Sequence, residues 1–436
     1  GGTCGQAGIL RFIFIAQQLQ AVALMSPGRI QLLLVLSLIV GLVGSSAKVE
    51  PTTGLVRVVC IGESYYPETR LPIILTADPR IRYQPIPANW YESTFGAVGG
   101  SKADVYRFMR LYLPRTYQRL VDAYDVILLS DFEVDVITGE QFAWMEKSTR
   151  EEGMGLGKYE MNWDPAHFAT LPIFVASAVY SAMPADLQEG KLIPKPLSGI
   201  YAVLLPETGR PHPMLDLPNM RKYQVLVSGD YGYEIPRPGA IVVARFLPKD
   251  EDAIIIWTYG EGRSLTCLPG HDKIDGSALV QWPYSLDFWI NQMWYLAGLE
   301  IPKDVELVHQ LREKSLAYSS ERSLTTAVID FVEKFGVSTG KLYDHLFEVD
   351  DAKKRADRLY LEERYEESLE KLKEAFEELT TVSDESVAMK EKALFWIYMA
   401  EWFTVMGTSV LTGFILWTLM VRRRLYREVK VTRSGR

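Results

Sequence analysis

The sequence predicts an α/β domain, followed by a helical stalk and one C-terminal transmembrane helix. Two continuous apolar runs of strand length, Val56–Ile61 and Val126–Leu129, are typical of strands buried on both faces of a parallel sheet. A helical stretch separates the two runs, and a second helix follows the later one. This alternation predicts a doubly wound, mostly parallel sheet with its ligand site at the carboxyl ends of the strands.

The helices between these strands are predicted from apolar spacing and capping residues. One helix is expected over Ala103–Ala123. A second is expected over Thr138–Ser148, because Thr138 and Gln141 form a near match to a capping box. The apolar side of the first helix would carry Val105, Phe108, Leu111 and Tyr112.

The later part of the domain is predicted to contain a β-hairpin and one more helix. The segments Ala253–Tyr259 and Arg263–Leu268 flank the turn-forming sequence Gly260-Glu261-Gly262. An amphipathic helix rich in Trp and Leu is expected over Tyr284–Leu299. We therefore place the α/β domain at residues 48–301.

The N-terminal end has the order of a secretory signal peptide. Residues 1–24 are expected either to be non-native or to lie upstream of the natural start, which we place at Met25. Residues 25–47 contain one basic residue, about fourteen apolar positions and a Ser-Ser-Ala exit. We expect cleavage after Ala47, and an uncleaved N-terminal membrane helix is the alternative.

The C-terminal segment is predicted to cross a membrane once. Residues 402–421 carry no charge, and this length spans the hydrocarbon core at about 1.5 Å per residue. Trp402 and Trp417 suit the two headgroup zones. Positive charge after a span favours the cytoplasmic side, so residues 422–436 would be cytoplasmic and the α/β domain extracytoplasmic. The basic residues that follow the span directly are Arg422, Arg423 and Arg424.

The charge distribution argues against a nucleic-acid partner. The chain has 47 basic and 55 acidic residues, a net charge of −8. The short tail after the predicted span is basic, so the folded body is even more acidic than the whole chain. Phosphate binding requires positive charge on the folded surface. We instead expect the lipid bilayer and a protein of the membrane or envelope as partners.

Five short sequences in a fixed order are similar to those of a glutamine amidotransferase family. The similarity covers residues 55–300 and implies the class I glutamine amidotransferase-like fold, a flavodoxin-like arrangement that trehalose-utilisation-like proteins share. The sequences are Gly62-Glu63-Ser64, Tyr124–Asp131, His212–Leu215, Ile254–Asp272 and the aromatic helix Phe288–Gly298.

The chain lacks the nucleophile that such an amidotransferase uses. The reaction requires a cysteine on a sharp strand-to-helix turn, activated by a His and a Glu. We expect this turn within Glu152–Tyr159, which contains no Cys, Ser or Thr. Cys60 and Cys267 lie in apolar strand-like runs and are expected to be buried, with a disulfide as the alternative. Cysteine-dependent glutamine hydrolysis is therefore not expected.

The resemblance places a set of candidate residues around one cleft. Carboxylates together with a His could bind a divalent metal or act as acid and base, whereas helix caps and local ion pairs are the structural alternative. The sequence requires no cofactor. Aromatic side chains nearby could bind a small molecule or a glycan, or pack beneath loops; they are Trp90, Tyr91, Trp163, Tyr231 and Tyr233. The candidate cleft residues are Glu63, Ser64, Asp131, Gly157, Lys158, Tyr159, His271 and Asp272.

Residues 302–401 are predicted to form a helical stalk. Two helices are expected over Lys303–Tyr318 and Ser323–Phe335, before Gly336 and Gly340 interrupt the pattern. From Asp350 the chain is expected to be helical. The sequence Thr381-Val382-Ser383-Asp384 would end that helix, and another would run from Glu385 into the membrane as the second arm of a hairpin. A coiled coil that binds a partner is the alternative.

These observations support three functional interpretations. The first is a membrane-anchored extracytoplasmic protein whose degenerate amidotransferase-like domain, a pseudoenzyme, binds a ligand or protein in a cell-envelope complex. The second is a cysteine-independent hydrolase that uses Glu63, Asp131 and His271 in the same cleft. The third is an accessory subunit that docks a membrane complex through its helical stalk.

Overall fold

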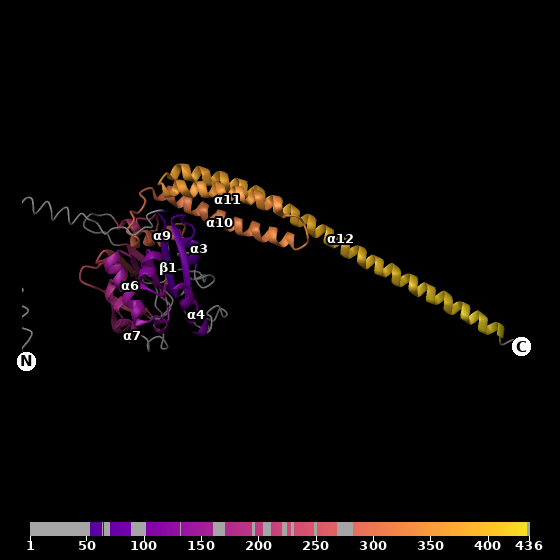
Figure 1. Ribbon diagram of the computed structural model, residues 1–436, viewed down its shortest axis with the longest axis horizontal. Helices are drawn as coiled ribbons and strands as arrows, with labels where there is room; N and C mark the ends of the chain where they lie inside the picture. Colours follow the sequence, from indigo (N-terminus) through magenta and orange to yellow (C-terminus); the bar gives the residue numbers. More distant parts are fainter. Residues whose placement is uncertain are drawn as a thin grey trace, which may run out of the picture.

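The computed structural model contains an α/β domain, a bundle of three helices and one long helix that leaves the bundle (Figure 1). The predicted signal peptide at 25–47 and the segment before it lie outside the described residues. The structure describes residues 53–62, 64, 70–88, 102–130, 132–159, 171–193, 197–203, 211–219, 225–227, 231–247, 251–267 and 282–433.

Within the described residues, nine strands form one mixed sheet in the order β2-β1-β3-β4-β11-β10-β9-β6-β7. The first five strands are parallel, and each later strand joins antiparallel. A separate antiparallel ribbon consists of β5 (Ala185–Ile193) and β8 (Tyr231–Pro236). The strands of the sheet are β1 Val56–Gly62, β2 Ile81–Pro87, β3 Val126–Ser130, β4 Gly155–Tyr159, β6 Leu197–Val203, β7 Val225–Val227, β9 Ile241–Leu247, β10 Glu251–Tyr259 and β11 Gly262–Cys267.

Helices cover both faces of the parallel strands, which confirms a layered α/β fold. In β1, Val58 and Cys60 belong to one buried cluster, whereas Val59 and Ile61 belong to the other. The first cluster includes the apolar face of α9, and the second that of α6. The helices of the domain are α3 Leu71–Leu75, α4 Lys102–Tyr112, α5 Tyr117–Ala123, α6 Gly139–Glu152, α7 Leu171–Val175 and α9 Ser285–Leu296, with 3-10 turns at Val134–Val136, Ala178–Ala182 and Pro213–Leu215.

The helix predicted over residues 103–123 is two helices. Pro114 lies between α4 and α5, and Thr116 begins α5 by accepting a hydrogen bond from the backbone N–H of Arg119. The predicted apolar side is also wrong in part, because Leu111 is 61% exposed while Met109 joins Val105 in the core.

The capping box and the hairpin are confirmed. Thr138 and Gln141 bond reciprocally at the start of α6, which ends at Gly153 in the left-handed conformation. Strands β10 and β11 pair with Tyr259 opposite Gly262. Gly260 has φ +60°, and a Cβ there would lie 2.2 Å from the carbonyl oxygen of Arg150, so the turn requires glycine.

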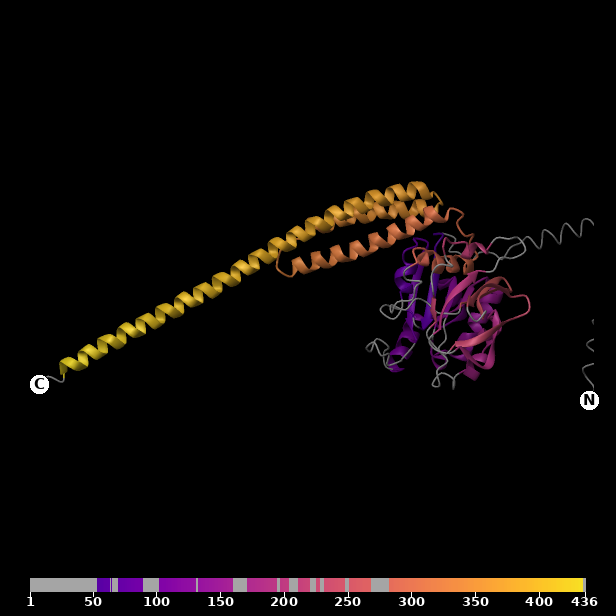
Figure 2. The same ribbon diagram turned by 180° about the vertical axis from the view of Figure 1, so that it is seen from behind.

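The stalk differs from its prediction in where its helices break. Helix α10 (Val305–Glu333) is continuous, so the predicted interruption after Tyr318 is absent. It ends before Gly336, which has φ +74°, and α11 begins at Gly340 and runs to Leu361. A second tight turn follows, where Glu363 adopts φ +62°. These turns produce three helices packed side by side (Figures 1 and 2).

Helix α12 (Tyr365–Arg433) is unbroken over 69 residues, so the helix break predicted at residues 381–384 is wrong. The hydroxyl of Thr381 bonds the carbonyl oxygen of Glu377 four residues earlier, as threonine does inside helices. Val382 is fully buried against the bundle. Tertiary packing therefore overrides the weak helix propensity of this segment. The hairpin stalk predicted from this break is replaced by the three-helix bundle.

The C-terminal part of α12 is long and apolar enough to cross a membrane, the one such helix among the described residues. None of its apolar stretch is buried against the rest of the protein. Trp402 and Trp417 are 67% and 61% exposed on this helix. The helix continues through Arg422, Arg423 and Arg424. A core helix of a globular domain would bury such a surface, so the exposed apolar surface matches the predicted span.

Candidate functional site

The position predicted for the cleft is at the carboxyl ends of β1 and β3. Here the order of successive parallel strands reverses, because β2 lies on one side of β1 and β3 on the other. Strand β1 pairs with β2 on one side and β3 on the other, and Gly62 lies opposite Ser130. A Cβ at Gly62 would lie 1.8 Å from the carbonyl oxygen of Ser130, and its φ is +119°. Glycine therefore allows the two strand ends to approach closely at the point where open α/β sheets bind ligands.

Ser64 is a candidate residue that the structure describes at this edge, beyond the end of β1. Its side chain is buried, and among the described residues its hydroxyl has no hydrogen-bond partner. Its carbonyl oxygen accepts a hydrogen bond of 2.7 Å from the Tyr83 hydroxyl, and burial raises the pKa of Tyr83 well above its ordinary value. A buried hydroxyl of this kind is available to a ligand or a neighbouring segment.

Four candidate residues lie outside the described part of the chain, namely Glu63, Asp131, His271 and Asp272. The same holds for Trp90, Tyr91 and Trp163, and for the side chains of Tyr231 and Tyr233. Within the part that the structure describes, no group of three or more His, Cys, Asp or Glu side chains could hold a metal ion. The metal-dependent hydrolase therefore rests on residues that the structure does not describe.

The expected position of the nucleophile turn is wrong. Residues Gly155–Tyr159 form strand β4, hydrogen-bonded between β3 and β11, because the turn after α6 comes already at Gly153. A strand-to-helix turn would have to follow Tyr159, and residues 160–170, between β4 and α7, contain no Cys or Ser and one Thr, Thr170. Cys60 and Cys267 are buried within β1 and β11, as predicted.

Lys158 forms a buried ion pair. Its ammonium group binds Glu234 of β8, and both side chains are almost fully buried. The Thr266 hydroxyl donates a hydrogen bond of 2.7 Å to the other carboxylate oxygen, and Thr266 lies opposite Lys158 in the β4–β11 register. This network joins the ribbon β5–β8 to the main sheet. Lys158 therefore has a structural partner that the sequence pattern does not reveal.

Gly157 and Tyr159 position helix α9 against the sheet. The Tyr159 hydroxyl donates a 2.9 Å hydrogen bond to Gln292, and its ring meets that of Trp289 edge to face at 5.4 Å. A Cβ at Gly157 would lie 2.6 Å from the Leu128 side chain. Both positions therefore support packing of the domain rather than an exposed catalytic turn.

A second polar cluster connects the α/β domain to the stalk, and we call it the junction network. Its centre is the carboxylate of Asp78, which is buried between α3 and β2. One oxygen of Asp78 accepts hydrogen bonds from Arg312 Nε at 3.0 Å, the Tyr360 hydroxyl at 2.8 Å and Trp294 Nε1 at 3.1 Å. These donors belong to α10, α11 and α9 respectively. The network consists of Asp78, Asp287, Asn291, Trp294, His309, Arg312 and Tyr360.

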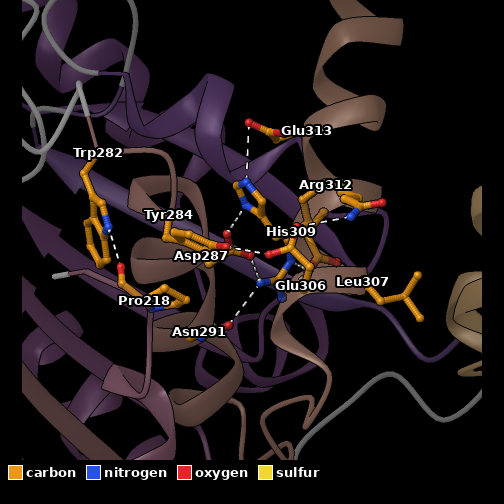
Figure 3. Close-up of polar contacts among 12 residues, drawn as sticks. Pro218, Trp282, Tyr284, Asp287, Asn291, Glu306, Leu307, His309, Arg312 and Glu313 are labelled. Atoms are coloured by element: carbon orange, nitrogen blue, oxygen red, sulfur yellow. Dashed lines mark hydrogen bonds and ion pairs between the residues drawn. The ribbon is translucent and has the colours of Figure 1, made fainter.

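Arg312 is the buried cation of the junction network (Figure 3). Its side chain is 1% exposed, and its Nη1 lies 2.7 Å from Asp287 and 3.1 Å from Asn291. The guanidinium thus bridges two carboxylates, Asp78 and Asp287, of the α/β domain. A buried carboxylate is tolerated only when paired and hydrogen-bonded, so Arg312 fixes where α10 docks.

His309 adds a titratable group to this network. Its Nδ1 lies 2.6 Å from Asp287 and its Nε2 lies 3.5 Å from Glu313, while its ring packs on Tyr284 at 4.3 Å (Figure 3). Burial by itself lowers the pKa of His309, but the hydrogen bond and charge of Asp287, with Glu313 and Glu306, raise it overall. The protonated ring therefore contributes to the docking of α10.

The junction network is absent from the sequence predictions, although the sequence contains a signal for it. Asp287 and Asn291 are polar residues four positions apart on an otherwise apolar helix, so they lie on one face of α9. Arg312 follows the buried residues Val308 and Leu311. A charge that interrupts an apolar face indicates a buried partner, but it does not identify Asp78, 234 residues away.

Comparisons with known proteins show no established family. No protein-family model matches the sequence, and no curated protein sequence matches it. Among solved structures, the chain is similar to two cytoplasmic proteins from Salmonella typhimurium. Each is 16% identical to this chain, and each match covers 55% of it. The first has a TM-score of 0.42 and is covered over 98% of its own length. The second has a TM-score of 0.39 and is covered over 99% of its own length. A β-galactosidase from Bacillus circulans sp. alkalophilus is 8% identical with a TM-score of 0.32, over 57% of this chain and 32% of that one. Likenesses this weak carry no argument about activity.

The first prediction concerns the cation of the junction network. Arg312→Met should lower the free energy of unfolding by about 3–5 kcal/mol, because it leaves Asp78 and Asp287 buried without their counter-ion. Urea unfolding of the full chain in detergent, followed by Trp fluorescence, measures the loss. Lys354→Met is the control, since Lys354 and its partner Asp351 are both largely exposed, and it should leave stability unchanged. Equal stability of Arg312→Met and the parent chain would contradict the assigned role.

The second prediction concerns the pH dependence of the same junction. The pKa of His309 is raised in the folded protein, so its contribution is fully present below the unfolded value of about 6.5 and is lost as pH rises through the folded pKa. The difference in unfolding free energy between the parent chain and His309→Gln should therefore shrink from pH 5.5 to about pH 9. Burial lowers the pKa of His212, so His212 makes stability change with pH in the opposite direction. This effect is the same in both chains, and it cancels when their unfolding free energies are subtracted. A difference that grows with pH would show that His309 is held neutral.

Proposed function

We propose that this protein is a membrane-anchored extracytoplasmic module that presents a non-glutaminase amidotransferase-like domain for binding a ligand or protein in a cell-envelope complex. The single observation that carries the proposal is helix α12. This one uninterrupted helix packs against α10 and α11, which are joined to the α/β domain. It then continues as an exposed apolar segment of membrane length. A protein built in this way holds its domain at a defined distance from a bilayer.

The geometry of the stalk supports a role in presentation. From Tyr365 to Glu401 the helix rises about 55 Å at 1.5 Å per residue. The stalk does not hang from a flexible linker, because buried hydrogen bonds from Arg312 and Tyr360 fix α10 and α11 to Asp78. Rigid presentation favours binding by lowering the conformational entropy lost when a partner is engaged.

The absence of a nucleophile supports binding rather than glutamine hydrolysis. The described thiols, Cys60 and Cys267, are buried inside strands, and residues 160–170 after β4 contain no cysteine. The close strand ends at Gly62 and the buried hydroxyl of Ser64 provide a location for a ligand at the switch point. The amidotransferase-like assignment itself rests on the sequence resemblance.

The proposed topology predicts which positions a membrane-impermeant maleimide labels in intact cells. Lys354→Cys, on an exposed part of the stalk, should react from outside, whereas Arg424→Cys should react only after the membrane is permeabilised. Both variants carry Cys4→Ser, and the buried thiols Cys60 and Cys267 provide the unlabelled background. The reverse pattern would show that the α/β domain is cytoplasmic.

The missing nucleophile predicts no release of ammonia from glutamine by the purified full chain. The measurement is a coupled ammonia assay in detergent, with Cys60→Ala and Cys267→Ala as matched controls for any trace activity. The parent chain and both variants should remain at the rate of the buffer. Glutamine-dependent ammonia release that either substitution abolishes would overturn the proposed non-glutaminase character.

A further inference from the structure

Helix α12 does not end with its apolar stretch but continues toward the C-terminus of the chain (Figure 1). Arg422, Arg423 and Arg424 form the start of this extension, and all three are exposed. Because successive residues of a helix are about 100° apart, three adjacent side chains project from different sides of the helix. We call these three residues the arginine collar.

The described residues give the arginine collar no carboxylate partner. An exposed lysine of the stalk, Lys354, pairs with Asp351 three positions earlier, but residues 402–427 contain no Asp or Glu. Before the collar the nearest acidic residue is Glu401, about 30 Å away along the helix. After it, Glu428 supplies one negative charge against three positive ones. The collar therefore keeps an excess of positive charge that can bind an anion from outside the chain.

With the span at residues 402–421, the arginine collar lies at the level of the lipid headgroups. This span rises about 30 Å, which equals the thickness of the hydrocarbon core. Arg422 is the next residue, so the guanidinium groups begin where the acyl chains end. Leu425 and Tyr426, directly after the collar, are 56% and 74% exposed. Apolar and aromatic side chains among basic ones suit the headgroup layer better than water.

We propose that the arginine collar binds the phosphate groups of anionic phospholipids in the leaflet where α12 leaves the bilayer on its C-terminal side. This inference rests on the proposed membrane anchoring and identifies the class of lipid at that end of the span. A guanidinium group presents a planar fork of N–H donors that binds two phosphate oxygens at once. Phosphatidylglycerol has a net negative charge, whereas the choline of phosphatidylcholine cancels the charge of its phosphate. The collar therefore distinguishes the two lipids by charge.

The geometry of the collar fits lipid headgroups better than a free phosphate ion. A site for one free ion requires donors that converge on it, but the three arginines project from different sides of one exposed helix. Headgroups surround a membrane helix, so each guanidinium group can bind a different lipid. Leu425 and Tyr426 add side chains that can contact the apolar part of such a lipid, which a free ion lacks.

Spin-labelled lipids test the contact with the full chain reconstituted in phosphatidylcholine vesicles. Electron spin resonance measures the fraction of labelled lipid held at the protein, with the label on phosphatidylglycerol or on phosphatidylcholine. At low salt the parent chain should prefer phosphatidylglycerol at least about threefold, because each collar arginine attracts its charge. Sodium chloride at roughly 1 M should reduce the preference to near one, since it screens exposed charges.

Two variants and a matched control identify the residues responsible. The collar variant replaces all three arginines by glutamine and should bind the two labelled lipids equally. A second variant replaces them by lysine, keeps the charge and should keep the preference for phosphatidylglycerol. The control removes the same number of exposed basic groups from the stalk and should behave as the parent chain; it carries Lys354→Gln, Arg364→Gln and Lys371→Gln.

The outcomes separate this inference from the anchoring proposal. A preference in the parent chain and the control but not in the collar variant supports the contact. Equal binding of both lipids by the parent chain, or a preference that the collar variant keeps, overturns the contact and leaves anchoring intact. A preference that sodium phosphate removes, but sodium chloride of equal ionic strength does not, would indicate a site for free phosphate and also overturns it.

Two further measurements complete the test. If the collar variant does not insert into vesicles, the salt dependence of the parent chain decides, and a preference unchanged by salt overturns the contact. Flotation of the parent chain with the vesicles after an alkaline wash tests anchoring by itself. A parent chain that does not float overturns the anchoring proposal.

Discussion

The arrangement of the whole molecule depends on one buried carboxylate, that of Asp78. It lies in the short connection between α3 and β2, and it accepts hydrogen bonds from one side chain in each of α9, α10 and α11. A single acceptor thus specifies where two stalk helices meet the α/β domain. Apolar contacts would allow the helices to slide, whereas hydrogen bonds to a buried charge have one geometry and a high cost when broken. The carboxylate of Asp287 adds a second fixed point by binding Arg312 and His309.

The position of α9, which carries part of the junction network, depends on a glycine in the sheet. Gly155 would place a Cβ 2.5 Å from the carbonyl oxygen of Leu296, so α9 can lie close to β4 only because that residue has no side chain. Helix α9 carries Asp287, Asn291 and Trp294. Its distance from the sheet therefore determines whether these groups reach Arg312 and Asp78. The docking of the stalk therefore depends on how closely α9 packs on the sheet of the α/β domain.

The sequence correctly predicted elements that are specified by neighbouring residues. It did not predict elements or contacts that are determined by packing between distant parts of the chain. Strands β1 and β3 were recognisable because both faces are buried, and α6 because its capping residues lie three positions apart. The break placed near Val382 failed because weak propensity yields to packing, and β4 looked like a loop because of its glycines. Of the candidate site, Lys158 was found without its partner Glu234, 76 residues away, since hydropathy does not show which buried charges meet.

Because α12 is continuous, the number of residues between the bundle and the apolar span sets how the α/β domain is rotated relative to that span. Between Ala393, the last residue of α12 that is buried among those whose burial is described, and Trp402, at the start of the apolar span, the helix is unbroken and cannot absorb an insertion. Each residue added there would turn the domain by about 100° around the helix axis and raise it by about 1.5 Å. Insertions in multiples of about seven residues would nearly restore the original azimuth. The length of this segment thus fixes the rotation of the α/β domain relative to the apolar span of α12.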